Sequence, residues 1–215
     1  MNNEKDIQGH TMTLFWSSRS PFVRKVMVVA HEAGLAGRIV LRRVNVSIVK
    51  PNADVVAVNA IGRIPVLLTP GRQWLADSRV IAEYLDALGG GPQLFPSGPE
   101  RWRALAWQAE GDGLMETLVA WRAERDRPAG ARSDAYIEAY RAKLERVADA
   151  LEARAGALAA APFSIGHIAL GCALAYADFR FEAEQWRDHR PALAAWHATF
   201  SRRPSAIATA FADEY

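Results

Sequence analysis

The chain has 215 residues, of which 50% are hydrophobic and 23% charged, so it can bury the core of one large domain or two small ones. Its 26 basic and 24 acidic residues give a net charge of +2, which does not favour nucleic-acid binding. Cys172 is the single cysteine, which excludes an internal disulfide and a Cys-x-x-Cys motif, and no metal site is expected. The polar start and the lack of a run of about 20 apolar residues predict a cytoplasmic protein with no membrane partner.

The first predicted elements are a strand, a polar turn and a helix. Residues 1–11 are polar and are expected to form a disordered extension. A short apolar run at 13–16 predicts the strand, and apolar residues at helical spacing predict a helix with Ser20 as N-cap and Pro21 as its first residue. The unpaired N–H groups and the dipole of a helix start suit it to hold an anion, including a thiolate.

Turn residues and apolar spacing predict the rest of an N-terminal domain at 12–88. Its further elements are, in chain order, a strand within 38–46, a short helix ending near 58, strands at 64–69 and 73–75 that form a hairpin, and a helix at 77–88. This order matches a thioredoxin-like α/β domain. Three glycines and a proline then begin a linker, which we place at 89–98.

The sequence after the linker predicts an all-helical domain at 99–215. Its helices are expected at 99–127, from Ser133 to near Gly156, from Ser164 through a very apolar stretch, and in two shorter segments at 191–200 and 204–212. Gly111 and Gly113 lie inside the first of these helices. They either permit close helix packing or leave room for a substrate, and we favour packing.

Three short motifs in the N-terminal domain carry a family resemblance. They are Ser-Pro-Phe at 20–22, Gly-Arg-Ile-Pro at 62–65 and Asp-Ser at 77–78. In this order they resemble the N-terminal domain of cytosolic glutathione transferases, and the resemblance covers nearly the whole chain from residue 12. It implies a thioredoxin-like domain followed by a helical bundle, a homodimer, and glutathione as the co-substrate that attacks a hydrophobic electrophile.

Such a reaction needs a group that stabilises the thiolate of glutathione. Lowering the pKa of a thiol by ~2 units requires roughly 2.7 kcal/mol of preference for the charged form. A hydroxyl hydrogen bond to a charged acceptor supplies about 1.5–3 kcal/mol, and a helix start adds up to about 1 kcal/mol. A serine at the start of a helix is therefore sufficient, without a covalent nucleophile.

Two serines are candidates for this catalytic hydroxyl. In the tau and omega classes the catalytic residue directly precedes Pro-Phe, as Ser20 does here, whereas in the zeta class it is the first of a Ser-Ser pair, like Ser17. We favour Ser20 because it combines the Pro-Phe match with the N-cap position, and Ser17 stays open. Positions 17, 18 and 20 hold no cysteine, which argues against the thiol oxidoreductase branch.

The resemblance assigns the remaining glutathione contacts to five residues. Ile64, before an expected cis Pro65, would pair its backbone with the cysteinyl part of glutathione like an added strand. Ser78 would hold the γ-glutamyl carboxylate and Asp77 the amino group, while Lys50 would reach the glycine carboxylate. Each has an ordinary structural alternative: an edge proline, a capped helix start and a solvated lysine.

Other positions depart from the family pattern or carry no assigned role. Arg24 and Lys25 are expected on solvated faces. The third bundle helix usually begins Ser/Thr-x-x-Asp, but here His167 follows Ser164 in place of the carboxylate. Because a carboxylate would accept the N-cap N–H and His167 is expected not to, the pattern predicts that His167→Asp stabilises the protein by about 0.5–2 kcal/mol.

The motifs do not choose one reaction. Conjugation, reductive dehalogenation, peroxide reduction and isomerisation all use the same machinery in enzymes that the chain resembles. An alternative of another class is a non-catalytic member that keeps the fold and acts as a ligand-binding or regulatory interaction protein. The retained motifs at 20–22, 64–65 and 77–78 favour the enzyme.

Overall fold

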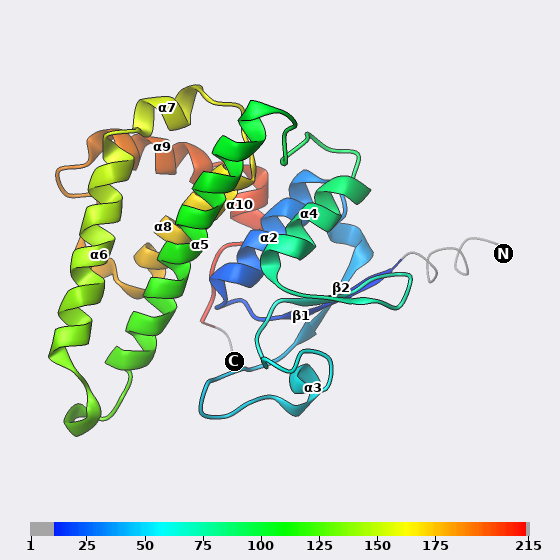
Figure 1. Ribbon diagram of the computed structural model, residues 1–215, viewed down its shortest axis with the longest axis horizontal. Coiled ribbons are helices and arrows are strands. Elements are labelled where there is room, and N and C mark those ends of the chain that lie inside the picture. Colours follow the sequence, from blue (N-terminus) through cyan, green and yellow to red (C-terminus); the bar gives the residue numbers. More distant parts are fainter. Residues whose placement is uncertain (1–10, 214–215) are drawn as a thin grey trace. The chain divides into compact units, whose positions relative to one another are not determined.

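The computed structural model describes residues 11–213, and its contacts divide the chain into two units (Figure 1). Unit 1 contains the described residues up to Phe95 together with those from Ala208 onward, and unit 2 is the continuous segment Pro96–Ile207. The division falls inside the expected linker at 89–98. Apart from Thr11, the extension expected at 1–11 lies outside the described residues.

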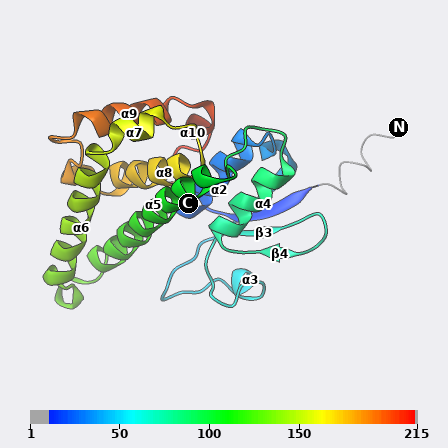
Figure 2. The ribbon, with the colours of Figure 1, turned by 45° about the horizontal axis from the view of Figure 1, so that its top comes forward.

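Unit 1 is a small mixed sheet with helices on both faces. Its elements are β1 (Met12–Trp16), α2 (Pro21–Glu32), β2 (Ile39–Arg43), α3 (Ala53–Val56), β3 (Val66–Leu68), β4 (Trp74–Leu75) and α4 (Ser78–Leu88). The strand order is β2-β1-β3-β4, with β1 parallel to β2 and antiparallel to β3, and β3 antiparallel to β4. Helices α2 and α4 lie side by side on one face of the sheet, and α3 lies on the other (Figures 1 and 2). This is the predicted thioredoxin-like arrangement.

Helix α2 is buried around almost its whole circumference, which contradicts one expectation. Arg24 is only 8% exposed and Lys25 is fully buried, so neither lies on a solvated face. The helical spacing of the apolar residues left Arg24 and Lys25 off the apolar face, but every residue from Val23 to Ala30 is buried. Charged side chains are rarely buried to this extent, so the start of α2 is an unusually polar part of the core.

Unit 2 is all-helical, as predicted. It contains α5 (Pro99–Arg125), α6 (Asp134–Glu152), α7 (Ala155–Ala160), α8 (Ile165–Arg180), α9 (Pro191–Ser201) and α10 (Pro204–Ala208), whose last residue is counted with unit 1. The apolar helix α8 is the buried centre and packs along α5. Among residues 11–213, no helix is both long enough and apolar enough to cross a bilayer.

The two glycines of α5 have different surroundings. A Cβ on Gly111 would lie 2.5 Å from the carbonyl carbon of Ala169, so this glycine lets α5 and α8 approach closely. A Cβ on Gly113 would meet no atom within 4 Å, and Gly113 lies beside a groove between α5 and α6. Packing explains the first glycine, whereas the second leaves open space.

The start of α8 contradicts the expectation for His167. Its Nδ1 atom accepts the Ser164 N–H at 3.1 Å, and its Nε2 atom lies 3.0 Å from the Leu158 carbonyl oxygen, so His167 completes a capping box. From the sequence, a carboxylate was expected to accept the N-cap N–H, and His167 was not. Burial lowers the pKa of His167 below its ordinary value, and a neutral imidazole offers one acceptor and one donor nitrogen. Both nitrogens have partners here.

Candidate functional site

Sheet topology brings the singled-out segments to one end of unit 1. Because β1 and β3 are antiparallel, the turn after Trp16 and the segment before Val66 lie at the same end of the sheet. Because β3 and β4 are also antiparallel, the chain leaves β4 toward α4 at that end. Strand β2 is parallel to β1, so the loop after Arg43, which holds Lys50, begins there too.

The turn between β1 and α2 presents the hydroxyl groups of both candidate serines, Ser17 and Ser20. Its backbone closes through the Ser20 N–H, which donates to the Ser17 carbonyl at 3.2 Å. The Ser20 Oγ accepts the Val23 N–H at 3.3 Å, which confirms Ser20 as the N-cap of α2, and the Ser17 Oγ accepts the Arg19 N–H at 3.4 Å. Within residues 11–213 neither hydroxyl donates a hydrogen bond, so each can donate to a ligand.

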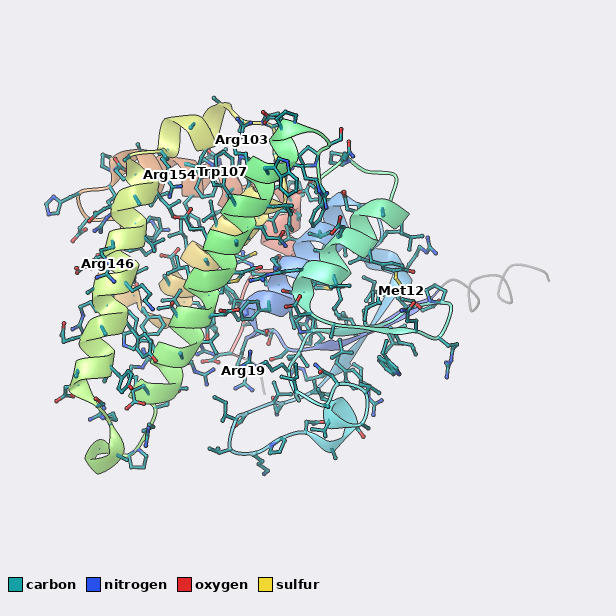
Figure 3. All side chains as sticks on the ribbon, in the orientation of Figure 1. Met12, Arg19, Arg103, Trp107, Arg146 and Arg154 are labelled. Carbon is teal, nitrogen blue, oxygen red and sulfur yellow. The ribbon has the colours of Figure 1, made fainter. Side chains whose placement is uncertain are left out.

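A side-chain bond ties this turn to the loop after β2. The Arg19 guanidinium donates to the Asn45 side-chain oxygen at 2.8 Å, and the Val44 N–H donates to the Trp16 carbonyl at 3.0 Å. Figure 3 shows Arg19 near this end of the sheet. Asn45 could not be found from the sequence, because a contact across 26 residues leaves no local pattern.

The segment before β3 offers backbone groups to a ligand. The Ile64–Pro65 peptide bond is cis, as predicted, and both side chains are buried. In the part of the chain that the structure describes, the N–H and carbonyl of Ile64 make no hydrogen bond. An extended peptide could therefore pair with this residue as an additional strand.

The start of α4 offers a second set of polar groups. Asp77 is the N-cap, and its Oδ1 atom accepts the Arg79 N–H at 2.9 Å. Ser78, the first helical residue, is 3% exposed, and its N–H is one of the unpaired donors of a helix start. These groups and the helix dipole favour a carboxylate at this position.

Lys50 is the remaining assigned residue. It is exposed on the loop after β2, and among residues 11–213 it makes no hydrogen bond or ion pair. The same described part of the chain contains no group of three or more side chains suited to hold a metal ion. The geometry is that of a site for an extended, anionic peptide-like molecule.

Comparisons with known proteins identify the family of this fold. A model described as "Glutathione S-transferase, N-terminal domain" matches residues 19–88, and one described as "Glutathione S-transferase, C-terminal domain" matches residues 134–199. The chain is 33% identical to the uncharacterized GST-like protein YibF of Escherichia coli (strain K12) over 187 aligned residues. The aligned region covers 85% of this chain and 90% of that protein. The chain belongs to the glutathione S-transferase family. The resemblance drawn from the sequence motifs is thereby confirmed, while the tau, omega or zeta subtype stays a prediction.

Solved glutathione S-transferase structures share this architecture closely. One is a family member from Pseudomonas fluorescens Pf-5 with bound glutathione, at 41% identity and a TM-score of 0.89, covering 93% of this chain and 98% of that chain. Another is the glutathione S-transferase from Methylobacillus flagellatus KT with glutathione bound, at 34% identity and a TM-score of 0.83, covering 94% and 100%. The Pseudomonas protein was also solved with S-(propanoic acid)-glutathione, a thioether of glutathione.

Proposed function

We propose that this chain is a glutathione transferase that binds glutathione at the end of its sheet and joins it through its sulfur to a hydrophobic electrophile. The convergence of two helix starts and an unpaired strand segment on one site carries the proposal. Helix starts favour bound anions and the unpaired backbone of Ile64 favours an extended peptide, and glutathione is an anionic tripeptide. The relatives of 34% and 41% identity that were solved with glutathione add support.

Each part of glutathione has a partner in this arrangement. The backbone of Ile64 pairs with the cysteinyl residue, which places its sulfur toward the turn between β1 and α2. Ser78 and the start of α4 bind the γ-glutamyl carboxylate, and the Asp77 oxygen that accepts no hydrogen bond within residues 11–213 receives the amino group. Lys50, on its exposed loop, reaches the glycine carboxylate with its ammonium group.

Ser20 performs the chemical role. Its oxygen already accepts the Val23 N–H, so its own hydrogen is left to donate to the thiolate. The thiol proton passes to solvent, the sulfur forms a bond with the electrophilic carbon, and the leaving group departs with its electron pair. A hydroxyl bond of about 1.5–3 kcal/mol with the helix start is enough to lower the thiol pKa by ~2 units.

Calorimetric titration with glutathione, followed by a conjugation assay on Ser20→Ala and Ser17→Ala, tests this assignment. We expect glutathione to bind and Ser20→Ala to lower the rate by more than about tenfold, which corresponds to roughly 1.4 kcal/mol of transition-state stabilisation. Ser17→Ala should change the rate little. A loss confined to Ser17→Ala would move the catalytic role to that serine.

Two further variants separate chemistry from capping. Ser20→Ala also removes an N-cap, at a cost of about 1 kcal/mol of stability, so the assay belongs well below the melting temperature. Ser20→Asn keeps a side-chain oxygen that can cap α2, but its conjugation rate should still be low. Ser133→Ala, which removes the N-cap serine of α6 in unit 2, should keep the wild-type rate. Absence of glutathione binding at millimolar concentration would instead favour a non-catalytic ligand-binding protein.

We also propose a cytoplasmic homodimer, on the strength of family membership. Two neighbouring apolar side chains on the loop after β2, Ile48 and Val49, are 87% and 91% exposed. Side chains of this kind are often covered by a partner surface, and they suit a contact between two copies of the chain.

A further inference from the structure

The end of the described chain returns to unit 1. Helix α10 ends at Ala208, and residues 209–213, here called the C-terminal strap, are counted with the N-terminal unit although all of unit 2 separates them in sequence. The strap has no regular secondary structure. What places it in unit 1 is therefore a set of specific contacts.

The first contact is with the turn that holds both candidate serines. The Ala212 N–H donates to the Ser18 carbonyl oxygen at 3.4 Å. Ser18 is a central residue of the turn that runs from Ser17 to Ser20. A bond to this carbonyl limits rotation of the peptide unit between Ser18 and Arg19, which lies between the two candidate serines.

The second contact is with the first turns of α2. The Arg24 guanidinium lies 4.6 Å from the centroid of the Phe211 ring, at the distance of a cation–π contact. The Arg24 N–H donates to the Ser20 carbonyl at 3.0 Å, so Arg24 lies one helical turn after the N-cap. Arg24 is only 8% exposed, and cation–π attraction is stronger in such desolvated places.

The turn is therefore tied to two other segments of unit 1. The Arg19 guanidinium links the turn to Asn45 and the loop after β2, whereas the strap links it to the far end of the chain. We infer that the C-terminal strap positions the turn from Ser17 to Ser20, with Phe211 and Arg24 as positioning residues. The effect on glutathione rests on the proposed function, but the effect on the turn does not.

The consequence for the reaction follows from the geometry of hydrogen bonds. A hydroxyl that shifts by a fraction of an ångström or tilts away loses much of its interaction with a thiolate. Ile64, Asp77 and Ser78, which are proposed to bind the rest of glutathione, lie on other segments. Loss of the strap should therefore lower kcat by about threefold to tenfold and leave KM nearly unchanged.

The first test uses the protein without glutathione. Hydrogen exchange is compared in wild type, a chain ending at Ala208, Phe211→Ala and Phe211→Tyr. Leu88→Ala is the control, because it removes an exposed apolar side chain at the last residue of α4. We expect amides at 17–23 to exchange at least about threefold faster in the shortened chain and in Phe211→Ala. Phe211→Tyr keeps the ring and, like Leu88→Ala, should match wild type. Unchanged exchange at 17–23 in the shortened chain would overturn the inference.

The second test measures the ionisation of the glutathione thiol in the complex. The ultraviolet absorbance of the glutathione thiolate in the complex is followed against pH in the same proteins. The midpoint, the pH at which half of the bound glutathione thiol is ionised, should rise by about 0.5–1 pH unit in the shortened chain and in Phe211→Ala. The same two proteins should show the lower kcat. An unchanged midpoint and an unchanged kcat would overturn the positioning role. If wild type fails to bind glutathione, the proposed function fails, and the exchange comparison alone decides about the strap.

Discussion

At the scale of single residues, His167 shows how a neutral imidazole takes the place of a carboxylate in a capping box. Its Nδ1 atom accepts the Ser164 N–H, while Nε2 is left to donate to the Leu158 carbonyl. The ring is 3% exposed and meets Trp107 edge-on at 5.3 Å. One side chain thus caps α8, satisfies a carbonyl of α7 and fills core volume.

These contacts reverse the expectation for His167→Asp. An aspartate could cap α8, but it would leave the Leu158 carbonyl without its donor, remove the ring from Trp107 and place a carboxylate in a buried site. We expect a loss of about 2–3 kcal/mol in the free energy of unfolding, measured by urea denaturation. A variant as stable as wild type would restore the sequence-based reading.

The same residue predicts a pH dependence of stability. Burial lowers the pKa of His167 in the folded state below its ordinary value of 6.5, so below that pH the unfolded chain binds a proton that the folded chain does not. This contribution to stability is complete above about pH 6.5 and is lost as the pH falls toward the folded-state pKa. His167→Asn can cap α8 but cannot titrate. Its unfolding free energy should therefore fall less than that of wild type between pH 7 and 5, and equal slopes would contradict the assignment.

At the scale of elements, the two glycines of α5 form a matched pair. Gly111→Ala would force a methyl group against the backbone of α8, where Ala169 and Leu170 cannot yield, and should cost about 1–3 kcal/mol. Gly113→Ala adds a methyl group in open space within the same helix and should stabilise the protein by up to about 1 kcal/mol. Thermal unfolding of both variants measures the contrast. Equal effects would show that contact with α8 imposes no packing cost at Gly111.

Most elements could be predicted because their signals are local. The N-cap serines at 20, 133 and 164 and the apolar spacing behind them mark the starts of α2, α6 and α8. Burial was harder to predict. The sequence shows that Arg24 and Lys25 are charged, but it does not show that both side chains are buried. The capping role of His167 was missed because it depends on a neutral tautomer, which the burial of the ring determines.

At the scale of the whole molecule, the motifs predicted the order of the two folds and the segments of the candidate site. Ser-Pro and Asp-Ser lie at the starts of α2 and α4, and Ile-Pro directly precedes β3, so the topology of the sheet was sufficient to gather them. The C-terminal strap could not be predicted in this way. Its bond joins Ala212 to Ser18, and a contact between such distant residues has no periodicity or spacing that a local pattern could reveal.

The membership of the strap in unit 1 also sets an order of events during synthesis. A ribosome releases the sheet, both candidate serines and the start of α4 before unit 2, and it releases the strap after unit 2. A nascent chain that stalls within unit 2 therefore carries every residue assigned to glutathione but lacks the segment that holds their turn in place. Unit 1 is therefore completed only after all of unit 2 has been made.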